Sequence, residues 1–258
     1  MSSEGAKGGF QAETNFINLV NNEWKTSSIL KSIFHDMNIE FDNVEHMTCE
    51  KPIKHNVKTD CFILISYLLK NDKNIHNISI KLVSSKLKKG FNQIDKRWIK
   101  SYAELLNIPD DIVFLLKLYT GEKQVSEYPN KPQILKDKKQ RRLFADEMII
   151  DDQKKLVKWF NENINAIFTL VFVGNDIEYQ PNFMLLIKGT GNNIEYKIHS
   201  ITDAINFYKG DSKSSISGRG NFHLGKLTIQ RKGGDKGKDT AKQLQFKFDP
   251  LAIWSWIK

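Results

Sequence analysis

Two stretches of this chain decide its fold, KTDCFILI at residues 58–65 and ISIKLV at residues 78–83. In the first, Asp60 precedes a run that is apolar at every position, which is typical of a strand covered on both faces. In the second, apolar and polar residues alternate, so Ser79 and Lys81 point to one face of a strand. The polar segment between the two stretches supplies turn chemistry. The sequence therefore predicts a β-hairpin that presents a carboxylate on one strand and a hydroxyl and an amine on the next.

This hairpin has two interpretations. In the first, the hairpin resembles the active-site hairpin of the PD-(D/E)XK nucleases, in which one strand carries a metal-binding carboxylate and the next carries a second ligand and a lysine; Asp60, Ser79 and Lys81 occupy these positions. In the second, the hairpin is purely structural and Lys81 extends its amine to solvent. The spacing of these residues alone does not decide between the two.

Length and composition predict a folded protein of mixed class. The chain has 258 residues, of which 40% are hydrophobic and 11% aromatic, enough to bury a sizeable core. Helices are predicted at residues 11–20, 27–37, 92–105, 110–119, 151–163 and 201–208, strands at 61–65, 78–82, 166–173, 183–188, 224–230 and 243–248, and a polar loop at 214–220. Because helices and strands are intermixed, we expect an α/β class with a central mixed sheet flanked by helices.

Charge points to a polyanionic partner. The net charge is +9 and the pI is about 9.3, and a basic surface concentrates nucleic acid. The competing explanation is a genome rich in A and T, since the lysines are spread along the whole chain. The chain contains no run of 18 apolar residues, so no transmembrane helix is predicted. Cys49 and Cys61 lack metal-knuckle spacing, so we expect reduced thiols in a cytoplasmic protein.

Two cation-rich segments carry nucleic-acid signals, KKGFNQIDKRW at residues 88–98 and TIQRKGGDKGKD at residues 228–239. Lysine and arginine bind phosphates, whereas amides and arginines can address base edges. Glycines let backbone amides approach a phosphate closely. The alternatives are an ordinary loop-to-helix junction for the first segment and a Gly-rich hairpin turn for the second, and the turn is compatible with DNA binding.

These segments also carry a family resemblance. The chain resembles the HinP-type (GCGC-cutting, MspI-related) type II restriction endonucleases of the PD-(D/E)XK nuclease superfamily. The matching blocks occur in the same order over nearly the whole chain: IKLVS at 80–84, GFNQIDK at 90–96, Arg141-Arg142 with Phe144, TIQRKGGD at 228–235 and LQFKFDP at 244–250. The resemblance implies a restriction-endonuclease-like fold in a single domain of residues 1–258, with a catalytic core at roughly 10–120 and DNA-recognition and C-terminal strands at roughly 165–250.

The resemblance also implies the catalytic residues. Asp60 corresponds to the family's metal-binding aspartate and Lys81 to its catalytic lysine. Ser79 departs from the pattern, because relatives carry glutamine or asparagine there; its shorter hydroxyl either ligates Mg²⁺ directly or holds a metal-bound water. Glu13 corresponds to a glutamate near the metal, although an acidic residue early in a helix is also favoured by the helix dipole. The expected cofactor is Mg²⁺, with Mn²⁺ as a substitute.

For DNA, the resemblance places contacts in both cation-rich segments. The expected DNA-binding residues are Lys89, Asn92, Gln93, Lys96, Arg97, Gln230, Arg231, Lys232, Asp235, Lys236 and Lys238. Lys236 and Lys238 are expected on phosphates, and Gln230, Arg231 and Lys232 at base edges. The implied substrate is double-stranded DNA with a short palindrome such as GCGC, cut to 5′-phosphate and 3′-hydroxyl ends. The implied partners are a second copy of the chain in a weak homodimer, unless it acts as a monomer, and a cognate DNA methyltransferase.

Two other functions stay open on the sequence. One is a catalytically weakened DNA-binding relative, in which Ser79 marks lost activity. The other is a structure-selective DNA repair nuclease of the same superfamily, which would cut at mismatches or branches without a fixed sequence. Cleavage of plasmid DNA in Mg²⁺, and the pattern of the fragments, separates these alternatives from a restriction enzyme.

Overall fold

The computed structural model describes residues 4–68, 70–83, 92–130, 132, 134–139, 141–189, 193–211, 213–233 and 238–256. The chain forms two compact units. The first comprises Met1–Gly90, Phe172–Phe207 and Asp249–Lys258, and the second comprises Phe91–Val171 and Tyr208–Phe248. The expected single domain, with its approximate inner division, stays a prediction.

A mixed sheet forms the centre of the first unit. Within the described ranges it has five strands in the order β1-β2-β3-β5-β6. The pair β3 and β5 is parallel, and the other neighbours are antiparallel. The strands are β1 (Val44–Glu50), β2 (Cys61–Tyr67), β3 (Lys70–Val83), β5 (Phe183–Lys188) and β6 (Glu195–Ser200).

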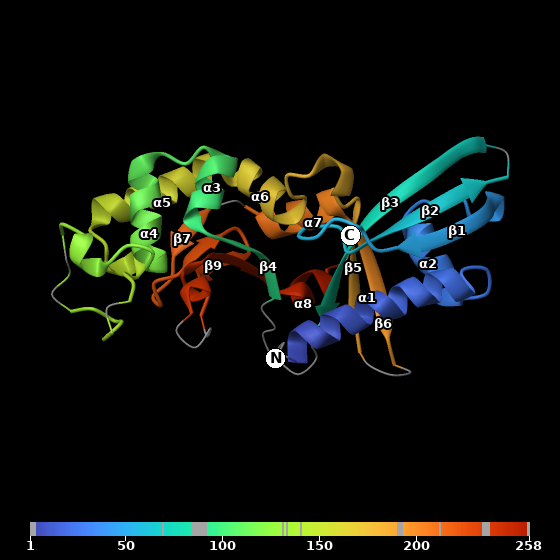
Figure 1. Cartoon of the computed structure of the whole chain (residues 1–258), viewed down its shortest axis with the longest axis horizontal. Helices are drawn as coiled ribbons and strands as arrows, with labels where there is room; N and C mark the ends of the chain where they lie inside the picture. Colours follow the sequence, from blue (N-terminus) through green and yellow to red (C-terminus); the bar gives the residue numbers. More distant parts are fainter. Residues whose placement is uncertain are drawn as a thin grey trace. The chain divides into compact units, whose positions relative to one another are not determined.

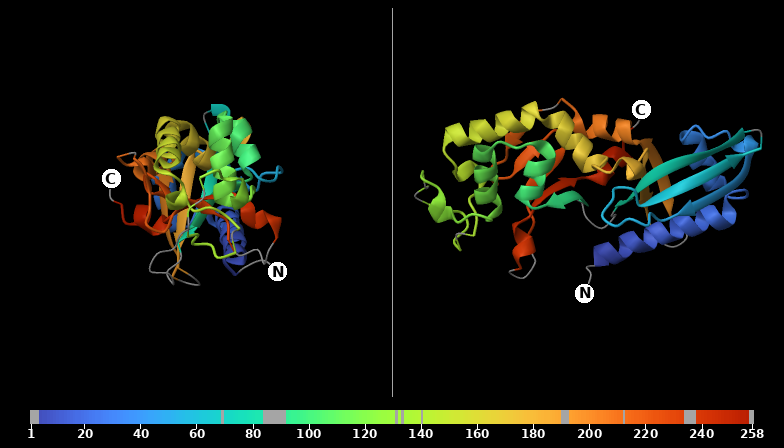
Figure 2. Two further views of the ribbon diagram at one scale, coloured as in Figure 1. Left: turned by 90° about the vertical axis from the view of Figure 1, so that its left-hand side faces the viewer. Right: turned by 45° about the horizontal axis from the view of Figure 1, so that its top comes forward.

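A long helix, α1, packs on β1 and β3, and a shorter one, α2, packs on β6 (Figures 1 and 2). In α1, Ala12, Phe16 and Val20 recur at a spacing of four and are all buried, so one stripe of the helix faces the sheet. Ser27 caps α2, since its hydroxyl accepts a hydrogen bond from the Leu30 amide. The helices of this unit are α1 (Glu4–Glu23), η1 (Phe41–Asn43), α2 (Ser28–Asp36), η4 (Ile177–Tyr179) and α8 (Pro250–Trp254).

A second sheet forms the centre of the second unit, antiparallel throughout the part that the structure describes, in the order β4-β10-β9-β8-β7. Its strands are β4 (Asn92–Arg97), β7 (Ser214–Ile216), β8 (Phe222–Leu224), β9 (Leu227–Arg231) and β10 (Leu244–Phe248). Its helices are α3 (Ile99–Leu106), α4 (Asp110–Thr120), η2 (Val125–Glu127), η3 (Ala145–Glu147), α5 (Ile150–Glu162) and η5 (Asp239–Lys242). The helices α6 (Ile164–Phe172) and α7 (Ile201–Lys209) contain two of the points where the chain passes from one unit to the other.

The predicted helix at residues 92–105 is wrong in its first half. Residues 92–97 form β4, which pairs with β10 across a register shift, and the helix begins only at Ile99. Helical spacing of apolar residues suggested one element, but the ladder with a distant strand overrides that local pattern.

The predicted strand at residues 166–173 is also wrong, because residues 166–172 lie in α6 and residue 173 follows it. A short run that is apolar on every side fits a buried helix as well as a buried strand. Ile167, Phe168 and Val171 are fully buried, at helical spacing.

Two smaller differences occur in the second sheet. Part of the predicted loop at 214–220 forms β7. The predicted strand at 224–230 breaks at Gly225, whose φ is +54° and where a side chain would lie 2.5 Å from the Tyr208 and Lys209 carbonyl oxygens. Only glycine fits such a turn, so β8 ends and β9 begins there.

The helix predicted at 11–20 begins earlier, at Glu4, and the strand predicted at 78–82 begins earlier, at Lys70, so most of the polar segment expected to form the turn pairs with β2 instead. The other predicted helices and strands are present within a few residues of their expected bounds, and Cys49 and Cys61 are free and buried. In the described ranges, no helix combines the length and apolar character that crossing a membrane requires.

Candidate active site

Asp60 is held at the point where β2 begins. Its backbone amide donates to the Ile78 carbonyl of β3 at 2.8 Å. The preceding residue, Thr59, is buried, and its hydroxyl donates to the Tyr179 carbonyl at 2.6 Å. The aspartate backbone is therefore fixed on both sides, and its side chain, 24% exposed, is directed by the scaffold.

Three groups of β3 converge on one oxygen of Asp60. The Ser79 hydroxyl donates to Oδ2 at 3.2 Å, the Ile80 amide at 2.6 Å and Lys81 Nζ at 3.1 Å. Lys81 Nζ also donates to the Ile80 carbonyl at 3.0 Å. The predicted carboxylate, hydroxyl and amine thus lie together, with Ser79 buried and Lys81 only 20% exposed.

Glu13 reaches the same place from α1. Burial, and then the negative charge of Asp60, raise the pKa of Glu13, whereas Lys51 and Lys81 oppose that rise. These influences require Glu13, Asp60 and Lys81 to lie within electrostatic reach of one another. Lys51, directly after β1, holds Glu13 through an ion pair between Nζ and Oε2 at 3.2 Å.

The donor atoms of this cluster suit Mg²⁺. They are carboxylate, hydroxyl and carbonyl oxygens, the ligands of a hard cation. Within the described part of the chain, Oδ1 of Asp60 accepts no hydrogen bond, which leaves it available as a ligand. Groups of three or more His, Cys, Asp or Glu side chains fit to hold a metal do not occur among the described residues. Two carboxylates are nevertheless sufficient for Mg²⁺, which keeps several of its waters.

In the second unit, the register of β4, β9 and β10 determines on which face of the sheet each expected DNA-binding residue lies. Gln230 lies opposite Gln245 in the register of β9 and β10, and Gln245 donates to the Gln93 side-chain oxygen at 2.7 Å. Lys96 pairs with Gln245 across β4 and β10, so it shares this face. Gln93, Lys96 and Gln230 therefore lie on one face, together with Gln245, a glutamine that the sequence had not indicated.

Arg97 and Arg231 lie on the opposite face. Arg231 pairs with Leu244 in the ladder and donates through Nε to the Ala241 carbonyl at 3.0 Å. Burial, followed by the charges of Arg142 and Arg141, lowers the pKa of Arg231, so these arginines lie within electrostatic reach of Arg231. Arg97 donates to the buried Asp95 at 3.1 Å.

Of the other expected DNA contacts, three lie on described residues and three do not. Asn92 begins β4 and is half-buried, and Lys232 follows β9, where its amide donates to the Gln243 carbonyl at 2.8 Å. Lys238 is exposed just before η5. Lys89, Asp235 and Lys236 lie outside the described residues.

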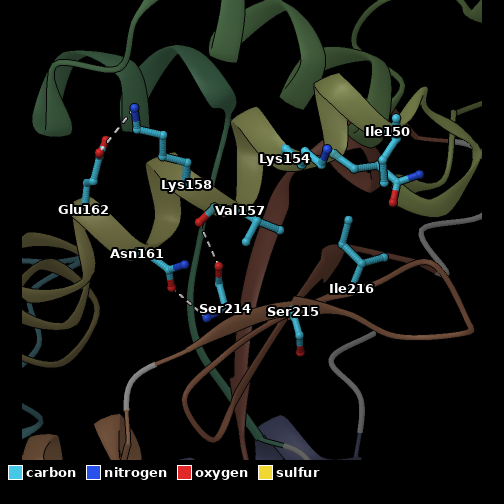
Figure 3. Close-up of a pocket in the computed structure, with 10 residues that line it drawn as sticks. Ile150, Lys154, Val157, Lys158, Asn161, Glu162, Ser214, Ser215 and Ile216 are labelled. Atoms are coloured by element: carbon cyan, nitrogen blue, oxygen red, sulfur yellow. Dashed lines mark hydrogen bonds and ion pairs between the residues drawn. The ribbon is translucent and has the colours of Figure 1, made fainter.

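A cavity in the second unit is separate from all of these residues. Figure 3 shows this space of about 680 Å³ between α5 and β7, lined by Lys154, Lys158 and Ile216 among others. Ser214 joins its two walls, donating through its hydroxyl to the Val157 carbonyl at 2.8 Å and through its amide to the Asn161 side chain at 2.7 Å. None of the expected site residues lines this cavity.

Lys51 and Gln245 are the residues that sequence reasoning missed. A lysine after a strand has no distinguishing pattern, and only its ion pair with Glu13 marks Lys51. Gln245 carried a signal, because it lies in the block LQFKFDP that supports the family resemblance and alternates with Leu244 and Phe246.

Comparisons with known proteins identify a family and a fold for the chain. The sequence model of a family described as R.HinP1I restriction endonuclease matches residues 39–254. A solved structure, described as the crystal structure of restriction endonuclease MspI in complex with its cognate DNA, has a similar fold. The TM-score is 0.63, the sequence identity is 14%, and the likeness covers 94% of this chain and 90% of that chain. No curated protein sequence matches the chain. The expected restriction-endonuclease-like α/β fold is therefore confirmed.

Proposed function

Because the chain belongs to the R.HinP1I restriction endonuclease family and is therefore a type II restriction endonuclease, we propose that it cuts double-stranded DNA with Mg²⁺ at a short palindrome. The observation that carries this proposal is the convergence of Ser79, the Ile80 amide and Lys81 on one oxygen of Asp60. The MspI structure was solved with its cognate DNA, which supports the same kind of substrate here.

The proposed chemistry divides the work between the metal and the chain. Bound Mg²⁺ would polarise the scissile phosphate and lower the pKa of a coordinated water. Asp60, oriented by its hydrogen bonds, would hold the metal with Glu13. Lys81 would orient the attacking water and offset negative charge that develops on the phosphate. In-line attack on phosphorus then leaves a 5′-phosphate and a 3′-hydroxyl.

We further propose GCGC as the recognition sequence, on the strength of the family resemblance. In the major groove guanine presents O6 and N7, which cations read, and cytosine presents an amino donor, which a side-chain oxygen can accept. The face with Gln93, Lys96 and Gln230 offers both kinds of group. A monomer or weak homodimer, a cognate methyltransferase and a cytoplasmic location complete the proposal.

Digestion of phage DNA tests the proposed function. Discrete fragments in Mg²⁺ or Mn²⁺ that disappear in EDTA are the expected result, and sequencing of the cut ends identifies the site. A smear would instead favour a nuclease without sequence specificity, and intact DNA in both metals at low salt would contradict the proposal.

Replacement of Ser79 tests its part in metal binding. Ser79→Ala removes the hydroxyl that donates to Asp60, and a lost hydrogen bond of about 0.5–1.5 kcal/mol corresponds to a roughly two- to tenfold rise in the Mg²⁺ needed for half-maximal cleavage. Ser79→Asn restores an amide of the kind relatives carry and is expected to need no more Mg²⁺ than the wild type. Equal Mg²⁺ dependence of Ser79→Ala and the wild type would exclude the hydroxyl from the metal site.

A second pair of variants distinguishes base contacts from phosphate contacts in the second unit. Gln230→Ala is expected to weaken binding of cognate DNA by about 1–3 kcal/mol and to leave binding of random DNA unchanged, because a base contact forms only with the cognate sequence. Lys238→Ala is expected to weaken both DNAs alike and to reduce the salt slope by about one. Affinities of both variants for both DNAs, measured in Ca²⁺ at two salt concentrations, check this assignment. Equal losses on the two DNAs for Gln230→Ala would place that residue with the phosphate contacts.

A further inference from the structure

Lys51 is a cation inside the active site that the proposed chemistry does not use. It follows β1 directly, and its Nζ lies 3.2 Å from Oε2 of Glu13. The Lys51 side chain is 46% exposed, whereas the Glu13 side chain is only 18% exposed. The amine is therefore on the more solvent-accessible side chain of the ion pair, within reach of a ligand that arrives from solvent.

This ion pair and a metal ion compete for the same carboxylate. Glu13 lies close enough to Asp60 for the two negative charges to repel each other, and a divalent cation between them would relieve that repulsion. A cation bound there would also repel the Lys51 ammonium. Metal binding is therefore expected to release Lys51 from Glu13. Because the Lys51 side chain is 46% exposed, the freed amine can bind a ligand that arrives from solvent.

We propose that Lys51 is a metal-responsive positioning residue, which pairs with Glu13 in the metal-free protein and contacts a DNA phosphate once the metal is bound. This inference rests on the proposed function and adds to it a contact that forms only in the metal-loaded complex. A DNA phosphate is an anion, as the Glu13 carboxylate is, so it can replace Glu13 as the partner of the Lys51 ammonium. The DNA backbone presents such phosphates at every nucleotide.

The loop that contains Lys51 supplies a matched control. Lys54 is also exposed and also ion-paired, but its partner is Asp176, which is no part of the Asp60 cluster. Lys51→Met and Lys54→Met remove the same charge from the same loop. Lys51→Arg keeps the charge and the ability to pair with a carboxylate or a phosphate.

The first experiment measures DNA affinity against salt concentration, with and without Ca²⁺. In Ca²⁺, Lys51→Met is expected to reduce the salt slope by about one relative to the wild type, because one phosphate contact is lost. Without metal, Lys51→Met is expected to match the wild type. Lys51→Arg should keep the wild-type slope in both conditions, and Lys54→Met should show no difference between them.

The second experiment measures Ca²⁺ binding to the protein without DNA by titration calorimetry. Lys51→Met is expected to bind Ca²⁺ about two- to fivefold more tightly, the worth of a partly exposed ion pair that no longer competes. Weaker Ca²⁺ binding would make Lys51 a structural support of Glu13 and would overturn the proposal. Equal salt slopes for Lys51→Met and the wild type in Ca²⁺, or an equal reduction with and without Ca²⁺, would overturn it too.

The wild type and Asp60→Asn separate this inference from the proposed function. If the wild type binds Ca²⁺ and Asp60→Asn does not, the metal site stands whatever Lys51 does. If the wild type binds no Ca²⁺, the metal site itself is wrong and the proposal for Lys51 falls with it.

Discussion

Lys81→Met is expected to lower the rate of DNA cleavage by about 100- to 1000-fold, the loss typical when one group that stabilises transition-state charge is removed. Binding of cognate DNA in Ca²⁺ is expected to stay close to that of the wild type, because the charge that Lys81 offsets develops only during the reaction. Methionine retains most of the length of the lysine side chain without its charge, so we expect the packing of β3 to be preserved.

Single-turnover cleavage and equilibrium binding measured on the same DNA check this prediction. Lys73→Met is the matched control, since Lys73 is an exposed lysine on the same strand. Its cleavage rate is expected to equal that of the wild type. A parallel loss of binding and cleavage in Lys81→Met would assign Lys81 to DNA binding or to the fold.

Asp60→Asn is expected to reduce cleavage by about a thousandfold or more, because the site loses a charged ligand and with it several kcal/mol of metal-dependent stabilisation. Asparagine keeps the shape of the side chain and an oxygen that can still accept from the Ile80 amide and Lys81. We therefore expect a folded protein that does not bind Ca²⁺ in calorimetry.

Asp176→Asn provides the comparison for this change. Asp176 has a similarly exposed carboxylate in the first unit, but it pairs with Lys54. Its replacement is expected to leave Ca²⁺ binding unchanged. Wild-type Ca²⁺ affinity in Asp60→Asn would show that the metal is held elsewhere.

The sequence predicted the convergence of Asp60, Ser79 and Lys81 on one hairpin because its signals are local. The position of Asp60 before a strand, and the shared face of Ser79 and Lys81, follow from the pleat of neighbouring residues. By contrast, the face on which Gln230 or Arg231 lies relative to Gln93 depends on the register between β4, β10 and β9. That register is set by pairing across more than a hundred residues of chain, which no local pattern reports.

The same distinction explains the other failures. Residues 92–97 became a strand through pairing with β10, and α6 could not be told from a strand by its apolar composition. Lys51 was missed because only its contact with Glu13, 38 positions away in the sequence, places it at the site. Long-range partners, rather than propensity, decided each of these cases.

The strand β3, which carries Ser79 and Lys81, has one partner, β5, that comes from a distant part of the chain, and the helix α8, from residues later still, packs on β3. Lys197 Nζ donates to the Trp254 carbonyl at 2.6 Å, which joins α8 to β6. During synthesis, the sheet that carries Asp60 and Lys81 can be completed only after these late residues have left the ribosome. An endonuclease assembled in this order would stay inert as a nascent chain until β5, β6 and α8 have emerged, and cellular DNA would meet the active form only after that point.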